Sequence, residues 1–256
     1  MLDIIILSQN NPQMLSLTLQ SLKKKFSEVK INVLFHGIEK GTPKGYLQLL
    51  EHWGEFSEIY WHTTNIGNYK KNLINLLKTL MSKEVLFLTD GDVLFDDFDI
   101  SEVQKCLLND EVLCHSLRLG LNTNVCTRME CENVIKAREE DNHIIWDWSK
   151  HYLDFGYPFS LHGHIFNTKE ITKLIKKAVF NDHFTLEEGL QMFELFPKKH
   201  MTAFKYSKSV FIPYNPEFIT IDDFLDGYTP DFESMDFTNI NKCEGEIHFE
   251  NIKIAK

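Results

Sequence analysis

The sequence has few of the features that set a chain apart from ordinary globular proteins. Its 256 residues include only 12 glycines and 7 prolines, which is too few for a fibrous or disordered chain. No apolar run approaches the roughly 18 residues of a membrane span. The N-terminal segment carries Asp3 where a secretory signal would carry basic residues. We therefore expect a globular protein that begins with a strand and contains one large domain, with or without an appendage.

Cysteine and positive charge are also scarce. The five cysteines form no CxxC pair, and the spacing of Cys126 and Cys131 fits no common zinc module. A reduced, cytoplasmic protein is therefore expected. The 27 Lys and Arg residues stand against 37 Asp and Glu, which gives a net charge of −10. This balance argues against a nucleic-acid partner, because such proteins usually carry a basic footprint.

Apolar runs alternate with helical patterns through the first hundred residues. The expected strands are residues 2–7, 31–35, 58–62 and 84–89. The expected helices are residues 12–26, capped by Asn11 with Pro12 at the first position, and residues 69–81, with a further helix between the second and third strands. The pattern predicts an α/β fold with a mostly parallel central sheet flanked by helices. In such sheets ligands bind at the carboxyl ends of the strands.

The second half is less regular. Strands are expected over residues 112–117, 158–166 (with a kink at Gly163) and 209–213. Capping boxes at Asn167–Glu170 and Thr185–Glu188 predict helices that run to about residues 177 and 196. The polar residues 122–148 suggest a long loop. Residues 214–241 hold seven acidic residues and no Lys or Arg, so residues 214–256 are interpreted as an irregular, acidic C-terminal extension.

The sharpest chemical signal is Asp90-Gly91-Asp92, directly after the buried strand 84–89. Two carboxylates at this spacing can meet one divalent cation, and Mg²⁺ or Mn²⁺ prefers oxygen ligands and keeps phosphate or water as further ligands. The alternative is a polar turn in which Gly91 supplies a permissive backbone.

A second, weaker signal is the segment from Asn65 to Asn72, which includes Gly67. It joins a strand end to a helix start, where backbone N–H groups favour anions such as phosphate. The alternative is a plain Asn-capped helix.

The order of these motifs resembles that of GT-A-fold glycosyltransferases of the family-2 type. The matching elements are the opening Ser8-Gln9-Asn10-Asn11-Pro12, the N-x-G-x(4)-N pattern at Asn65, Gly67 and Asn72, and the D-x-D element at Asp90 and Asp92. A wider similarity, to glycosyltransferase-like proteins of surface-polysaccharide loci, involves residues 116–120, 146–148, 157–158, 163–166 and 186–187.

The resemblance implies a metal-dependent enzyme that moves a sugar from a nucleotide-diphosphate-sugar to a glycan or lipid-linked acceptor, with inversion. Residues 1–100 would form the nucleotide-sugar half and residues 101–213 the acceptor half. Asp90 and Asp92 would hold Mn²⁺ or Mg²⁺ against the diphosphate. The residues expected to contact the nucleotide are Ser8, Asn10, His36, Asn65, Gly67, Asn72, Asp90 and Gly91. One departure is that His36-Gly37 stands where many such enzymes carry an acidic residue, with Glu39 slightly later.

The acceptor half should supply a general base within reach of the acceptor hydroxyl. Glu187 is the candidate, because the capping box assigns Glu188 a structural role; alternatively Glu187 is a first-turn acid favoured by the helix dipole. His162 and His164 alternate on an expected strand and share a face. They bind acceptor, phosphate or metal in one interpretation and are structural in the other.

Trp146 and Trp148 are expected to stack on acceptor sugars or to anchor the loop, and both alternatives stay open. Arg118 suits a phosphate or a salt bridge, and His248 is a candidate for reaching a metal or diphosphate. The clusters Lys23–Lys25, Lys173/Lys176/Lys177 and Lys198/Lys199 are typical of solvated helix ends. Together they also suit peripheral contact with the inner face of an anionic membrane.

Three other functions compete with this interpretation. The sequence around Asp90-Gly91-Asp92 superficially resembles the nucleophile strand of haloacid-dehalogenase-type phosphatases, although Leu94 stands where that motif has Thr or Val. A nucleotidyltransferase would need a glycine-rich loop after the first strand, where this chain has Ser8–Pro12. A non-catalytic nucleotide- or carbohydrate-binding module on the same fold is the third alternative.

Overall fold

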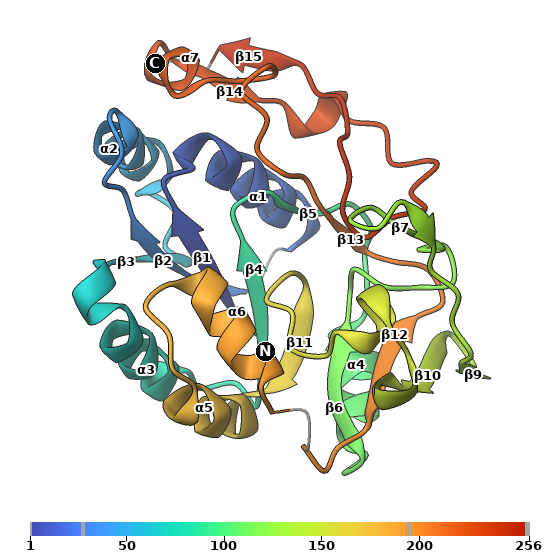
Figure 1. Ribbon diagram of the computed structural model, residues 1–256. Helices are drawn as coiled ribbons and strands as arrows, with labels where there is room; N and C mark the ends of the chain where they lie inside the picture. Colours follow the sequence, from blue (N-terminus) through green and yellow to red (C-terminus); the bar gives the residue numbers. More distant parts are fainter. Residues whose placement is uncertain (1, 27–28, 194–195, 254–256) are drawn as a thin grey trace.

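The computed structural model describes residues 2–26, 29–193 and 196–253, which form three layers (Figure 1). A central sheet of nine described strands, in the order β3-β2-β1-β4-β11-β6-β12-β10-β9, lies between two layers of helices. Its strands are β1 (Asp3–Gln9), β2 (Lys30–His36), β3 (Ile59–Thr63), β4 (Glu84–Thr89), β6 (Val112–Ser116), β9 (Arg138–Glu140), β10 (His143–Asp147), β11 (His164–Asn167) and β12 (His200–Phe204).

The first half of the sheet is parallel, as predicted. Strand β1 pairs in parallel with both β2 and β4, and β2 pairs in parallel with β3. Residues of β1 from Ile4 to Leu7 are fully buried, which is the expected environment of a strand covered on both faces. Because Leu7 pairs with Thr89, the ends of β1 and β4 bring Ser8 and Gln9 beside Asp90.

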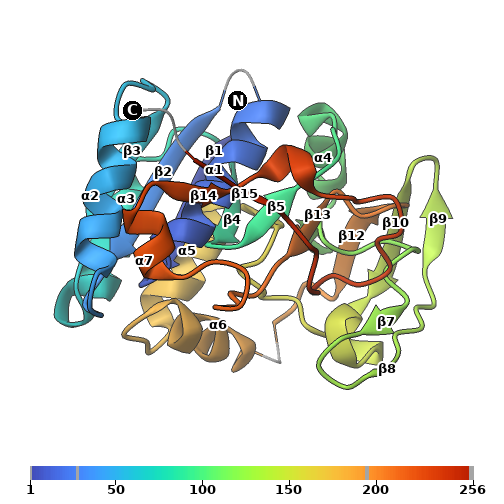
Figure 2. The same cartoon turned by 90° about the horizontal axis from the view of Figure 1, so that it is seen from above.

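Helices cover both faces of the sheet (Figures 1 and 2). On one face lie α1 (Pro12–Lys25), α2 (Thr42–Trp53) and α4 (Ile100–Leu107), whose apolar side chains share a core with Ile4 and Ile6. On the other face lie α3 (Tyr69–Thr79), α5 (Thr168–Lys177) and α6 (His183–Gln191), which share a core with Ile5 and Leu7. Successive side chains of β1 point to opposite faces of the sheet and thus pack into two separate cores.

The prediction of a long loop over residues 122–148 is wrong. The segment contains a short hairpin, β7 (Val125–Cys126) with β8 (Cys131–Glu132), and it then supplies β9 and β10 to the central sheet. Strand β10 pairs with β12, a strand that the sequence analysis did not predict. Ile144 and Trp146 point into the core while their neighbours are only half-buried, so a polar-looking sequence carries the two-residue period of a strand.

Two further boundaries differ from the predictions. The strand expected over residues 158–166 begins only at His164, because Gly163 adopts φ +71° and turns the backbone. Helix α6 begins at His183 and is capped by Asp182, whose capping-box partner is Thr185, so the predicted Thr185–Glu188 box is wrong. Part of that predicted helix, residues 194–195, lies outside the described residues. The cap at Asn167 is confirmed, since its side chain accepts from two backbone N–H groups of α5.

The C-terminal extension runs across α1 (Figure 2). It contains α7 (Ile221–Leu225), which packs against α2, and the pair β14 (Tyr228–Pro230) with β15 (Asn251–Lys253). Its apolar side chains, including Phe232 and Phe249, form a third core with Met14 and Leu17 of α1. Nearby, β5 (Asp92–Leu94) pairs with β13 (Ser209–Phe211). None of the helices in the described ranges has the length and apolar character needed to cross a membrane.

Candidate active site

Asp90 lies at the carboxyl edge of the parallel half of the sheet. Its Oδ2 atom accepts hydrogen bonds from the Ser8 hydroxyl at 2.9 Å and from the backbone N–H of Gln9 at 3.0 Å. The Ser8 Oγ is in turn 2.7 Å from the Tyr46 hydroxyl. Burial raises the pKa of Asp90 to about 7, because the two hydrogen bonds only partly offset the desolvation of the carboxylate.

The Asp90-Gly91-Asp92 turn is built around the glycine. Gly91 adopts φ +96°, and a Cβ there would lie 2.4 Å from the carbonyl oxygen of Ile212. The backbone N–H of Gly91 donates to Thr18 Oγ1 of α1 at 3.0 Å. The turn is thus held between α1 and the strand end of β13, and it needs glycine both for its conformation and for space.

Asp92 turns its carboxylate back toward the end of β4. Its Oδ2 atom accepts from the backbone N–H of Thr89 at 2.6 Å and lies 3.2 Å from Nδ1 of His162. The Asp92 side chain is 2% exposed. Burial alone would lower the pKa of His162, but the charge of Asp92 and its hydrogen bond outweigh burial and raise it. The His162 ring also packs on Phe211, with 4.3 Å between ring centroids.

Glu187 approaches the same place from α6. Its Oε2 atom accepts from the backbone N–H of Leu161 at 2.7 Å and lies 3.5 Å from Ser160 Oγ. It also interacts with the Tyr157 hydroxyl, and burial together with the Glu187 charge raises the pKa of Tyr157. Glu187 was preferred over Glu188 because a capping box was expected to engage Glu188, and the structure does not form that box. Glu187 itself ties α6 to the loop that carries His162.

Asp90, His162 and Glu187 line one pocket of about 340 Å³. Asp90 and Thr89 line it from the parallel sheet, Glu187 and Glu188 from α6, and His162 from the loop before β11. The other lining residues are Asn11, Arg128, Tyr157, Leu161, His183, Phe184, Phe211, Pro213 and Tyr214. Carboxylates from both halves of the chain therefore face a common cavity.

The fit of this pocket to a divalent cation rests on Asp90. Among the described residues, no group of three or more His, Cys, Asp and Glu side chains is placed to hold a metal ion. Asp92 is engaged by Thr89 and His162. Asp90 faces the pocket. Ser8 and Gln9 bind its Oδ2 atom and not its Oδ1 atom, so Oδ1 is a hard oxygen donor for a cation. It suits an ion that takes its other ligands from phosphate oxygens and water.

The other residues expected at the nucleotide lie around the neighbouring strand ends. Asn10 accepts from the backbone N–H of Ile38 at 2.8 Å and donates to Glu39 at 3.1 Å, so it fixes the turn after β2. His36, at the end of β2, is buried, and neither ring nitrogen has a partner among the described residues.

The Asn65–Asn72 segment forms the turn after β3. Asn65 caps a short 3-10 helix, η1 (Ile66–Asn68), by accepting from the backbone N–H of Asn68 at 3.0 Å, and Gly67 is exposed. Asn72 donates to Thr64 Oγ1 at 3.1 Å. Asn72 lines a separate pocket beside β3, whereas Asn65 and Gly67 line neither pocket. Their contact with a nucleotide stays a prediction.

Several acceptor-half candidates are part of the core. Trp146 and Trp148 are 2% and 6% exposed, and their indole N–H groups donate to the carbonyl oxygens of Phe155 and Lys198. This burial favours the anchoring role over sugar stacking. His164 is fully buried beside the Pro158 carbonyl, at 3.3 Å, and does not share a face with His162 because the strand begins after Gly163.

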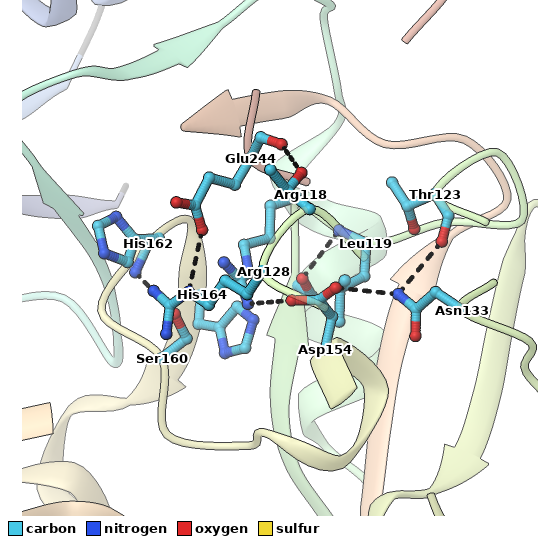
Figure 3. Close-up of polar contacts among 12 residues, drawn as sticks. Arg118, Leu119, Thr123, Arg128, Asn133, Asp154, Ser160, His162, His164 and Glu244 are labelled. Carbon is cyan, nitrogen blue, oxygen red and sulfur yellow. Dashed lines mark hydrogen bonds and ion pairs between the residues drawn. The ribbon is translucent and has the colours of Figure 1, made fainter. Parts of the chain in front are cut away.

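Arg118 and His248 also lie away from the pocket lining. The Arg118 guanidinium is buried and lies 3.5 Å from Asp154, which Asn133 also contacts at 3.1 Å (Figure 3). This geometry favours the salt-bridge interpretation of Arg118. His248 is exposed and packs against Phe218, within the C-terminal extension.

Sequence reasoning missed several residues that line the pocket. Arg128, Tyr157 and Phe211 come from loops or short strands, and His183 and Tyr214 flank them. Burial, reinforced by the neighbouring histidines, lowers the pKa of His183 to about 4. Residue spacing carried no signal for them, because contacts between distant segments bring them together.

Comparison with known proteins supports the fold. No family model matches the chain, and no curated protein matches it. The structure of S. aureus TarS residues 1–349 in complex with UDP matches with a TM-score of 0.52 and 14% identity, covering 81% of this chain and 59% of that one. The same part of TarS in complex with UDP-GlcNAc matches with a TM-score of 0.52 and 13% identity, covering 84% and 59%.

The chain thus spans about three fifths of the TarS structures that it matches. At this low identity the similarity defines the fold alone. The protein has the mixed α/β fold of GT-A glycosyltransferases, with a large central sheet flanked by helices.

Proposed function

We propose that the protein is a glycosyltransferase that takes a sugar from a nucleotide-diphosphate-sugar. The observation that carries the proposal is the pocket where Asp90, at the carboxyl edge of the parallel sheet, faces Glu187 of α6. Ligands of open α/β sheets bind at that edge. The shared fold with TarS, whose structures contain UDP and UDP-GlcNAc, adds support.

In this proposal Asp90 holds the donor diphosphate through Mn²⁺ or Mg²⁺. The bound cation would neutralise the charge that develops on the departing diphosphate. Ser8 and the backbone of Gln9 orient the Asp90 carboxylate through Oδ2, which leaves Oδ1 for the cation. Asp92 holds His162 and the turn in place, so its role here is to position the site rather than to face the cavity.

Glu187 is the proposed general base. Its carboxylate lines the cavity and is oriented by the Leu161 N–H and Ser160. A base fixed in this way takes the proton of an acceptor hydroxyl as that oxygen attacks the sugar, and direct attack of this kind inverts the anomeric centre. The acceptor class we propose is a glycan or a lipid-linked sugar, as in surface-polysaccharide synthesis.

Peripheral contact with a membrane is part of the same proposal. Of the basic clusters, Lys24 and Lys25 are engaged with Glu233 and Asp97, and Lys198 with Glu170. Lys173, Lys176 and Lys177 of α5 are exposed. They are the residues proposed to meet an anionic surface, where each basic residue contributes about 1 kcal/mol.

Ligand-induced stabilisation tests the donor site. Nucleoside diphosphates and nucleotide-sugars are screened by thermal shift with and without Mn²⁺, because a ligand that binds the folded state raises the melting temperature. We expect one nucleotide to stabilise the protein only with metal, and Asp90→Asn to abolish the effect. Asp110→Asn is the matched control, because Asp110 is exposed in a turn and does not line the pocket. Stabilisation that survives in Asp90→Asn would remove Asp90 from the donor site.

A further inference from the structure

The segment of residues 240–245, in the C-terminal extension, joins two walls of the pocket. On one side it meets the loop that leads to Arg128: Asn122 donates to the Ile240 carbonyl at 2.9 Å, and the Val125 N–H donates to the Asn241 carbonyl at 3.2 Å. The Thr127 hydroxyl continues this series by donating to the carbonyl oxygen of Glu244.

On its other side the 240–245 segment pairs with β13. The backbone N–H of Phe211 donates to the Cys243 carbonyl at 3.1 Å, and the N–H of Gly245 donates to the Phe211 carbonyl at 3.0 Å. Phe211 lines the pocket and packs on His162. The extension is therefore bonded to residues on two sides of the cavity, which lie more than 80 residues apart in the sequence (Arg128 and Phe211).

Within this arrangement Glu244 is paired with Arg128. The Nε atom of Arg128 lies 3.2 Å from Glu244 Oε2 (Figure 3). The Glu244 side chain is 18% exposed and that of Arg128 is 62% exposed, so a mostly fixed carboxylate holds an open guanidinium. Among the described residues, no hydrogen bond engages the two Nη groups of Arg128.

Arg128 is also the one Lys or Arg among the described residues that line the pocket, where it faces a cavity with Asp90, Glu187 and Glu188. A guanidinium presents its N–H groups as a planar fork that matches two oxygens of a phosphate. Because Glu244 occupies the Nε side, the Nη edge of the fork remains for a ligand in the cavity. Holding the side chain in advance reduces the entropy lost on binding.

We propose that Arg128 binds a phosphate group of the substrate and that Glu244 of the C-terminal extension positions it. The inference rests on the proposed function and deepens it, because it makes the extension part of the substrate site. The phosphate belongs either to the donor diphosphate or to an anionic acceptor, and the two sources are separable by experiment.

The test measures dissociation constants for inorganic pyrophosphate and for the nucleoside diphosphate, by calorimetry on the full chain with Mn²⁺. Arg128→Ala is expected to weaken pyrophosphate binding about tenfold or more, as loss of a charge-assisted pair does. Arg128→Lys recovers part of the affinity, because it keeps the charge without the fork. Glu244→Gln, which keeps the shape but not the charge, weakens binding about threefold. Arg138→Ala is the control, because Arg138 is exposed and paired with Glu140 outside this pocket. It is expected to leave the dissociation constants unchanged.

The nucleotide arm identifies the source of the phosphate. Equal weakening of nucleoside diphosphate and pyrophosphate by Arg128→Ala assigns Arg128 to the donor. Unchanged nucleoside diphosphate binding, with weaker inorganic phosphate binding at saturating nucleotide, assigns it to the acceptor. If Arg128→Ala leaves the dissociation constants of all these anions unchanged, Arg128 only balances the charge of the pocket carboxylates, and the inference is overturned. Failure of every nucleotide to bind wild type would instead refute the proposed function, while the pyrophosphate arm still reports on Arg128.

Discussion

The Asp92 carboxylate lies 3.2 Å from the imidazole of His162, and the two residues are 70 positions apart in the sequence. The same carboxylate accepts from the backbone N–H of Thr89. The second acid of the D-x-D element is thus bonded within the fold, whereas the first, Asp90, faces the cavity. Two acids of the same motif should therefore respond differently to substitution.

Asp92→Asn is expected to lower the free energy of unfolding by about 1–3 kcal/mol, because the amide removes the charge that pairs with buried His162. Asp90→Asn is expected to keep or raise stability near neutral pH. Burial raises the pKa of Asp90 to about 7, so removing its charge removes a cost of folding. Urea denaturation of both variants measures the contrast, and equal losses would contradict the separate roles.

The glycine between the two acids offers a second test. An alanine costs about 1–2 kcal/mol wherever φ is left-handed, and Gly91 and Gly227 have φ values of +96° and +92°. Only Gly91→Ala also places a Cβ 2.4 Å from a backbone oxygen, whereas nothing lies within 4 Å at Gly227. Chemical denaturation should show the larger loss for Gly91→Ala. A loss no larger than that of Gly227→Ala would mean that the turn relaxes freely.

For Glu187, the base assignment predicts a loss of turnover without a loss of binding. Glu187→Gln keeps an oxygen that accepts from the Leu161 N–H, so the loop should stay in place. Removing a general base typically lowers kcat by about 10²–10⁴, and the affinity for the nucleoside diphosphate should stay unchanged. Glu188→Gln, the adjacent exposed acid in the same pocket, is the control. Equal kcat for Glu187→Gln and wild type would remove Glu187 from the reaction.

Buried neutral histidines predict a loss of stability in acid. Burial, reinforced by neighbouring His143, lowers the pKa of His115 well below its ordinary value. In the unfolded chain His115 takes up a proton near pH 6.5, whereas in the folded state it stays neutral to a lower pH. Neutral His115 therefore costs no free energy of unfolding above about pH 6.5, and the free energy of unfolding falls as the pH drops below that value.

Replacing His115 should make the free energy of unfolding less dependent on pH between about 7.5 and 5. His115→Phe keeps an aromatic ring beside Phe204, whose ring centroid lies 4.8 Å from that of His115. His52→Phe, at an exposed position of α2, is the control. An unchanged pH slope in His115→Phe would show that folded His115 takes up its proton over the same pH range as the unfolded chain, so that its pKa is not lowered.

Local patterns in the sequence predicted the first half of the fold well. The buried strands before Ser8 and Asp90 read as continuous apolar runs, and their parallel pairing followed from the helices between them. The pattern also brought Asp90 and Glu187 forward as candidates, and the structure places them in one pocket. Their chemical roles stay predictions.

Residues fixed by distant contacts were beyond such patterns. Strand β10 is a strand because it pairs with β12 some 55 residues later, as Trp146 does with Met201. His162 and His164 point to different partners because of one backbone angle at Gly163. Arg128, which lines the pocket, pairs with Glu244, more than 100 positions away in the sequence. No local periodicity in the sequence predicts any of these contacts.

Sugar transfer from a nucleotide-diphosphate-sugar at Asp90 would release the nucleoside diphosphate of the donor. The most direct measurement is the release of nucleoside diphosphate from a panel of nucleotide-sugars incubated with Mn²⁺, followed by chromatography. We expect wild type and Asp110→Asn to release one nucleoside diphosphate above the enzyme-free rate, and Asp90→Asn to release none above that rate. Release at the same rate by Asp90→Asn, or no release from any donor with any glycan or lipid-linked acceptor, would contradict sugar transfer at Asp90.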